Sequence, residues 1–242
     1  CVSSPSGLPP NLSPPRSIHW RCIFPHAISG LFNFKRQRPQ ELLGPNGIIP
    51  SDNMTAGVEE KLDKVYEARV NGHAIDLRLA AQIFIKKEHA VYGELLREGV
   101  EIIISKFPDR FTSGNVFYDI GAGQGKLISH IALKTDVSKS IGIELAEQRV
   151  KNANDIFSLV DFGARPPVMI HGDAFHHDFS DATVAYFDGT MFKTPDSSRL
   201  VSRLPAGCLL ITRGPNSFDP DGTFEAPTSY YPDGAKFKYK VL

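Results

Sequence analysis

The sequence predicts an α/β protein with a Rossmann-like, mostly parallel sheet of seven strands that closes with an antiparallel hairpin and is preceded by helices. Three observations support this prediction. Short apolar segments alternate with helical segments from residue 116 onward, which is the pattern of right-handed βαβ units. A turn with glycine at positions 121, 123 and 125 follows the first of these apolar segments. The last segment alternates apolar and polar residues, which is typical of a hairpin strand.

The composition fits one globular core with a small appendage. Of the 242 residues, 41% are hydrophobic and 22% are charged, which are ordinary values for a soluble domain. No run approaches about eighteen apolar residues, so we expect no membrane span. Cys1, Cys22 and Cys208 lack the spacing of a disulfide framework or a metal site, and a reducing compartment is expected.

Residues 1–50 differ from the rest of the chain. They contain nine of the eighteen prolines, and residues 1–40 contain five basic residues but no Asp or Glu. Such a segment sustains neither a helix nor a central strand. We interpret it as a disordered tail or, because it is rich in Arg and Ser and begins at Cys1, as an organelle-targeting peptide or an incomplete start.

Residues 41–242 are mildly acidic. They hold 22 basic and 27 acidic residues, a net charge of −5. A surface that binds DNA or nucleosomes usually carries a basic footprint. The part of the chain that is expected to fold does not supply one.

Residues 51–107 are predicted to form an N-terminal helical segment, because apolar residues recur there at spacings of three and four. Two stretches show this pattern: Val58, Leu62, Val65 and Tyr66, and Leu96, Val100, Ile103 and Ile104. Residues 108–242 are predicted to form the core domain.

The strands of the core domain are expected at residues 116–120, 140–144, 168–171, 183–188, 208–212, 229–231 and 236–241. Its helices are expected at residues 126–134, 148–160 and 194–204. The last helix has a clear start, because Thr194 supplies a capping hydroxyl and Pro195 suits the first helical position. Pro232-Asp-Gly234 supplies the turn of the hairpin.

The turn at residues 121–125 predicts a ligand site, because ligands of α/β folds lie across the carboxyl ends of parallel strands. A dinucleotide fingerprint would need a third glycine where the chain has Lys126, so a dehydrogenase is disfavoured. Glycine at every second position, with Asp119 before them, suits a ligand with a cationic amino-acid end, and S-adenosylmethionine is the leading candidate. The expected contacts are Asp119, Gly121, Ala122, Gly123, Gln124 and Gly125.

The next two strands end in further suitable groups. Glu144 closes the second strand 25 residues after Asp119, close to the separation at which an acid binds ribose hydroxyls. After the third strand, Asp173 is expected to accept from an adenine amino group and Phe175 to flank the ring, with Ala174 between them. The competing interpretations are a plain glycine turn and a solvated helix cap at Glu144.

These residues and a tripeptide upstream of them carry a family resemblance. The motif order is Tyr92-Gly93-Glu94, Asp119-Ile-Gly-Ala-Gly, Gly142-Ile-Glu144 and Gly172-Asp173. It resembles the disruptor-of-telomeric-silencing family, which are non-SET histone lysine methyltransferases with a class I fold. The resemblance implies methylation of a protein lysine, in the nucleus or the cytoplasm. It also implies that Tyr92 and Glu94 lie in a loop that closes over the cofactor and helps to form the lysine channel.

One part of the site departs from that family. After the fourth strand the family carries a paired Asn followed by an aromatic residue, whereas the run here is Asp188-Gly-Thr-Met-Phe192. Tyr92, Tyr186 and Phe192 are candidate walls of a channel that favours a neutral amine, with core packing as the alternative. The predicted catalytic residues are Tyr92, Glu94 and Asp188, each in a positioning role.

Other functions stay open. The acidic core and Asp188 favour a class I methyltransferase with another acceptor, such as a non-histone protein, RNA or a small molecule. A cofactor-binding module without turnover is a third hypothesis. A nucleosome partner is implied by the resemblance but not supported by charge. The His and Asp residues at 171–178 lack the spacing of a metal site, so no metal is expected.

Overall fold

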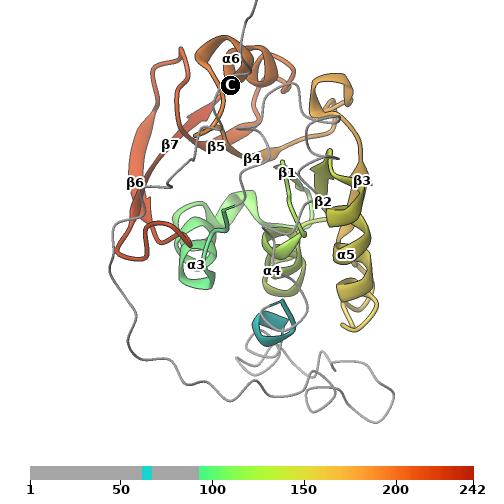
Figure 1. Ribbon diagram of the computed structural model, residues 1–242. Helices are drawn as coiled ribbons and strands as arrows, with labels where there is room; N and C mark the ends of the chain where they lie inside the picture. Colours follow the sequence, from blue (N-terminus) through green and yellow to red (C-terminus); the bar gives the residue numbers. More distant parts are fainter. Residues whose placement is uncertain (1–61, 67–92) are drawn as a thin grey trace, which may run out of the picture. The chain divides into compact units, whose positions relative to one another are not determined.

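The computed structural model describes residues 62–66 and 93–242, all within one compact unit (Figure 1). The proline-rich segment 1–50 and most of the predicted helical segment 51–92 lie outside the described residues. Residues 62–66 form a short helix. Within the described part of the chain, no helix reaches the length and apolar character that a membrane crossing requires.

Seven strands form a single sheet. They are β1 (Val116–Ile120), β2 (Lys139–Glu144), β3 (Val168–His171), β4 (Val184–Asp188), β5 (Leu209–Arg213), β6 (Gly222–Ala226) and β7 (Ala235–Val241). Their order is β3-β2-β1-β4-β5-β7-β6. Strands β1 to β5 pair in parallel, and β7 runs antiparallel to both of its neighbours. The predicted mostly parallel sheet with a terminal antiparallel hairpin is therefore confirmed.

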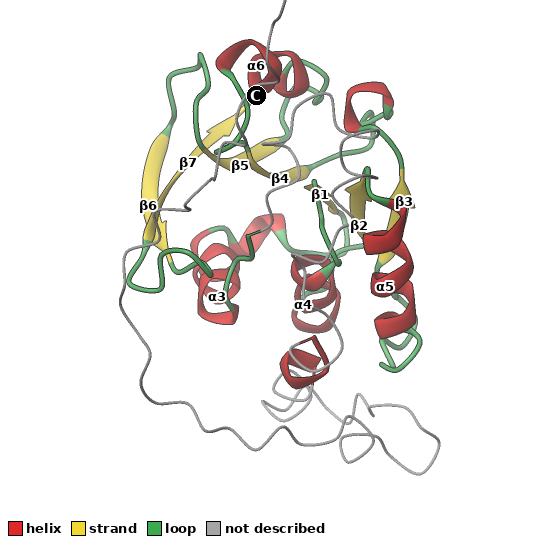
Figure 2. Cartoon of the chain, viewed as in Figure 1, coloured by secondary structure: helices red, strands yellow, loops and turns green. Residues whose placement is uncertain are grey.

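Helices cover both faces of this sheet (Figure 2). They are α3 (Arg97–Lys106), α4 (Lys126–Lys134), α5 (Glu147–Phe157) and α6 (Thr194–Val201), with the short 3-10 turns η4 (Pro108–Arg110) and η5 (Ala174–His176). Helices α3, α4 and α5 lie on one side of the strands and α6 lies on the other. Helices α5 and α6 end earlier than the sequence pattern predicts, at Phe157 and Val201.

The two faces build two apolar clusters from alternate residues of the same strands. Phe117 of β1 packs with α3 and α4, whereas Tyr118 and Ile120 pack with α6. All five residues of β1 are buried, as expected for a central strand of a parallel sheet that is covered on both faces. The core thus holds the carboxyl end of β1 rigidly.

The first strand of the hairpin lies elsewhere than predicted. We expected it at residues 229–231, but β6 occupies Gly222–Ala226. Thr228 instead forms an antiparallel bridge with Leu95, and the Ser229 amide donates to the Glu94 carbonyl over 2.8 Å. The connection between β6 and β7 therefore pairs with the segment that precedes α3.

The turn between β1 and α4 requires glycine. Gly121, Gly123 and Gly125 have φ angles of 82°, 57° and 75°, a left-handed region that other residues rarely adopt. Gly142 of β2 lies against this turn. A Cβ atom there would come within 2.6 Å of the Ala122 Cβ and 2.7 Å of the Met169 sulfur.

We expect Gly142→Ala to destabilise the protein by about 1–3 kcal/mol, because the added methyl group overpacks the turn. Urea unfolding measures this change. Gly114→Ala is the matched control, since a Cβ atom at Gly114 meets no atom within 4 Å. Equal unfolding midpoints for the two variants would contradict the close packing.

Candidate functional site

A pocket of about 750 Å³ lies at the carboxyl ends of the parallel strands. Its walls also come from the segment before α3 and from the connection between β6 and β7. Ten of the residues predicted as site residues line it: Glu94, Asp119, Gly121, Ala122, Gly123, Glu144, Asp173, Ala174, Phe175 and Asp188. Tyr92 lies outside the described residues.

Gln124 and Gly125, predicted as cofactor contacts, do not line this pocket. Gln124 is 2% exposed, and its carbonyl accepts from the Tyr66 hydroxyl. Gly125 is the N-cap of α4, and a Cβ atom there would come within 2.7 Å of the Phe157 ring. Both residues support the turn from behind.

Glu144 is the buried acid at the centre of the site. Its two carboxylate oxygens accept from the amides of Gly123 and Ala146, each over 2.9 Å. Arg149 lies 3.7 Å from one of these oxygens. Burial raises the pKa of Glu144, and the Arg149 charge and the backbone amides oppose that rise. A carboxylate has about four acceptor positions, so Glu144 keeps capacity for ligand hydroxyls.

Asp119 is the second buried acid of the pocket. It is 5% exposed and lines the pocket beside two other carboxylates. Burial, together with the negative charges of Glu144 and Asp188, raises the pKa of Asp119 to about 8. A bound ammonium group would favour the ionised form and lower this pKa.

Asp173 and Phe175 form the pocket wall beyond β3. Asp173 caps η5 by accepting from the Phe175 amide over 2.9 Å, and it pairs with the His176 ring over 3.0 Å. The Arg199 guanidinium lies over the Phe175 ring, 5.0 Å from its centroid. Within residues 62–66 and 93–242, no three metal-ligating side chains gather into a metal site.

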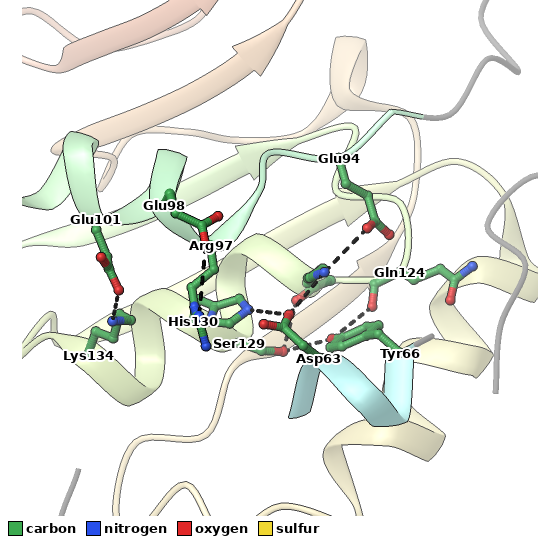
Figure 3. A network of polar contacts seen from close by, with 12 residues as sticks. Asp63, Tyr66, Glu94, Arg97, Glu98, Glu101, Gln124, Ser129, His130 and Lys134 are labelled. Carbon is green, nitrogen blue, oxygen red and sulfur yellow. Dashed lines mark hydrogen bonds and ion pairs between the residues drawn. The ribbon is translucent and has the colours of Figure 1, made fainter. Parts of the chain in front are cut away.

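Glu94 is held at the pocket by a network of charges (Figure 3). The Lys126 ammonium lies 3.6 Å from Glu94 and 3.0 Å from Asp63, and His130 lies 3.2 Å from the same Asp63 oxygen. Burial alone would raise the pKa of Asp63, but the His130 hydrogen bond and the Lys126 charge lower it to about 2. The short helix 62–66 is thereby tied to α4 and to the pocket.

Asp188 and Tyr186 stand on the remaining side of the pocket. The Asp188 carboxylate lies 3.4 Å from the Arg213 guanidinium and also accepts from the Thr190 amide. Tyr186 is 6% exposed and packs against Phe237, so it serves the core while also lining the pocket. Asp188 is therefore part of an ion pair, which the sequence pattern does not predict.

Sequence reasoning missed several pocket residues: Lys126, Arg149, Arg199, Arg213, Tyr230 and Tyr231. The rule that found Asp119 and Glu144 could also have found Arg213, because Arg213 ends the parallel strand β5. Tyr230 and Tyr231 are not predicted as pocket residues because the sequence pattern places them in a strand.

The pocket fits S-adenosylmethionine. A Cβ atom built on Gly121 or Gly172 meets nothing within 4 Å, so the backbone leaves room for a closely approaching ligand. Two buried acids, Asp119 and Glu144, match an ammonium group and a pair of hydroxyls. A seven-stranded sheet with an antiparallel β7 is the fold of the class I S-adenosylmethionine-dependent methyltransferases, and the cofactor of that class agrees with the prediction.

Comparison with known proteins agrees with the family resemblance. Residues 66–161 match a family model described as histone methylation protein DOT1. A protein-lysine N-methyltransferase of Saccharolobus islandicus is 29% identical over 83 residues, which are 34% of this chain and 48% of that protein. The chain thus spans about half the length of this curated relative. The chain has the fold of a class I methyltransferase, and residues 66–161 resemble the DOT1 family.

Two solved structures illustrate the range of similar proteins. An RNA methyltransferase from Salinibacter ruber, in complex with S-adenosyl-L-homocysteine, is 19% identical with a TM-score of 0.47, over 61% of this chain and 92% of that one. Magnesium protoporphyrin IX methyltransferase from Synechocystis PCC 6803, with bound S-adenosylmethionine, is 15% identical with a TM-score of 0.47, over 71% and 84% of the two chains.

We expect the stability of the cofactor-free protein to fall as the pH rises toward the raised pKa of Asp119, about 8. The unfolded chain has an Asp pKa of about 3.9, so between these values the folded state binds more protons than the unfolded state. Asp119→Asn should reduce the dependence of the unfolding free energy on pH. Urea unfolding at a series of pH values measures this dependence. If the pH dependence of the unfolding free energy is unchanged in this variant, another acid such as Glu144 causes it.

Proposed function

We propose that this chain is an S-adenosylmethionine-dependent methyltransferase that methylates a lysine side chain of a protein. The observation that carries the proposal is the set of three acids, Asp119, Glu144 and Asp173, which lie at or just beyond the carboxyl ends of β1, β2 and β3 and line one pocket. The match to the DOT1 family and the similarity to a protein-lysine N-methyltransferase support a lysine acceptor.

Three parts of the cofactor have matching partners in the pocket. Asp119 would pair with the amino group, and Glu144 would accept from the ribose hydroxyls. Asp173 and Phe175 would hold the adenine, with Arg199 fixing the ring of Phe175 from one side. The bound cofactor supplies a methyl group on a positively charged sulfur. The role of the chain is to fix this group in line with the acceptor.

We assign to the acceptor a part of the pocket that contains apolar and aromatic side chains. Tyr186, Met191, Phe192 and Tyr230 line it, and Tyr230 packs so closely on Gly93 that a Cβ there would lie 2.9 Å from its ring. Apolar and aromatic walls exclude water and disfavour an ammonium ion, so they favour the neutral amine that attacks. The positioning of the methyl group in line with the amine accounts for catalysis, so no general base is required.

A different acceptor is the second candidate function. Residues 41–242 carry a net charge of −5, which is unfavourable for contact with DNA phosphates. This charge favours an acceptor other than the nucleosome.

We expect Glu144→Gln to weaken S-adenosylhomocysteine binding by roughly 10- to 100-fold in calorimetric titration, because a charged acceptor of two hydroxyls is lost. Glu147→Gln is the matched control, since Glu147 is the exposed acid in the first turn of α5. Gly121→Val should abolish binding by filling the open space above the turn. Wild-type protein that binds no cofactor product would overturn the proposal.

We expect radiolabelled methyl groups to appear on lysines of soluble lysate proteins, and more weakly on nucleosomes because of the acidic charge. Amino-acid analysis of the labelled fraction would identify methyl-lysine, and the Glu144→Gln protein is the blank. Label in the RNA or small-molecule fraction would favour the second candidate. Cofactor binding without label in any fraction would indicate a module without turnover.

A further inference from the structure

An ion pair stands at the acceptor side of the pocket. Asp188 ends β4 and Arg213 ends β5, and the two residues are direct partners in the parallel register of these strands. The Arg213 guanidinium lies 3.4 Å from the Asp188 carboxylate, and both residues line the pocket. The pair is therefore fixed by the sheet.

Aromatic packing and hydrogen bonds hold the pair in place. The Arg213 side chain is 11% exposed, and its guanidinium lies 5.2 Å from the ring centroid of Tyr231 and 5.6 Å from that of Phe237. The amide and the hydroxyl of Thr190 both donate to the Asp188 carboxylate. A guanidinium stacked between aromatic faces keeps its charge and loses little freedom by forming the pair.

The two charges of the pair cancel each other. The carboxylates Asp119 and Glu144 lie at the ends of β1 and β2, beside the turn that we assign to the cofactor. An unpaired Asp188 would add an unbalanced carboxylate near Asp119 and Glu144. An unpaired Arg213 would add a cation next to a positively charged cofactor. Water would screen either charge only in part, because the Arg213 side chain is 11% exposed and the Asp188 side chain is 35% exposed.

Methyl transfer moves a positive charge across this region. The lone pair of the acceptor amine forms the new N–C bond while the C–S bond breaks and its electrons remain on sulfur. Sulfur becomes neutral, the nitrogen becomes positive, and one proton leaves the product amine for solvent. A fixed negative charge at the acceptor side would hold the amine as an ammonium ion, which cannot attack.

We infer that Asp188 and Arg213 act as a charge-balancing pair that keeps the acceptor side neutral, so that the cationic cofactor is accepted and an amine acceptor enters unprotonated. This inference rests on the proposed function. Arg213 acts through Asp188 as a positioning residue. The acceptor class that suits this pair is an amine that carries no charge when it enters the pocket.

The test is a double-mutant cycle read by the ratio of two dissociation constants. S-adenosylmethionine carries the positive sulfur and S-adenosylhomocysteine does not, so their ratio reports the electrostatic potential at sulfur. Asp188→Asn leaves Arg213 unbalanced and should weaken S-adenosylmethionine relative to the product by about tenfold. Arg213→Gln should shift the ratio by about tenfold in the opposite direction, and the double variant should return near the wild-type ratio.

Methyl transfer supplies a second readout. Arg213→Gln should bind S-adenosylmethionine more tightly and yet lower kcat, a combination that loss of folding does not produce. Lys139→Gln is the control for the removal of one cation, because Lys139 pairs with Asp181 at the opposite ends of the strands. It should leave the ratio unchanged.

The outcomes separate this inference from the proposed function. Wild-type protein that binds neither ligand would overturn the proposed function itself. If the wild-type protein binds both ligands and the ratio of their dissociation constants is the same in all three variants, only the charge-balancing role is overturned. Single variants that shift the ratio in the same direction would also overturn it, since they would indicate loss of structure.

Discussion

The site depends on the hydrogen bonds that Glu144 accepts from the amides of Gly123 and Ala146. These bonds join the turn after β1 to the turn after β2. A carboxylate buried to 4% exposure is costly unless it is well paired, so the two backbone amides are a condition for its presence. Gly142 makes the same contact possible, because any side chain there would push Ala122 away from the strand. The acid that we assign to the ribose hydroxyls is thus also a structural residue.

A second set of contacts joins parts of the chain that are far apart in sequence. Lys126, at the start of α4, lies between Asp63 of the short helix and Glu94 of the segment before α3. The Ser229 hydroxyl accepts from the Glu94 amide over 3.0 Å. Glu94 is consequently tied to α4 through Lys126 and to the connection between β6 and β7 through Ser229, and the same Lys126 holds the short helix 62–66.

The sequence predicts the strand ends well and the pocket mouth poorly, for one physical reason. Asp119 and Glu144 follow apolar strands, and parallel pairing brings such ends together whatever the loops do. The connection between β6 and β7 is held instead by the pairing of Thr228 with Leu95, a contact between residues far apart in the sequence that no local pattern predicts. Gln124 has a suitable place in the turn, but Tyr66 binds its carbonyl from behind.

The charges of the pocket leave Asp119 without a positive partner. Burial, and after it the negative charges of Glu144 and Asp188, raise the pKa of Asp119 to about 8. Arg149 offsets Glu144 and Arg213 offsets Asp188, whereas no ion pair to Asp119 is present among the described residues. A cationic ligand would supply the missing partner. The pocket therefore gains the most from a ligand that brings positive charge to the end of β1, which is where S-adenosylmethionine would place its amino group.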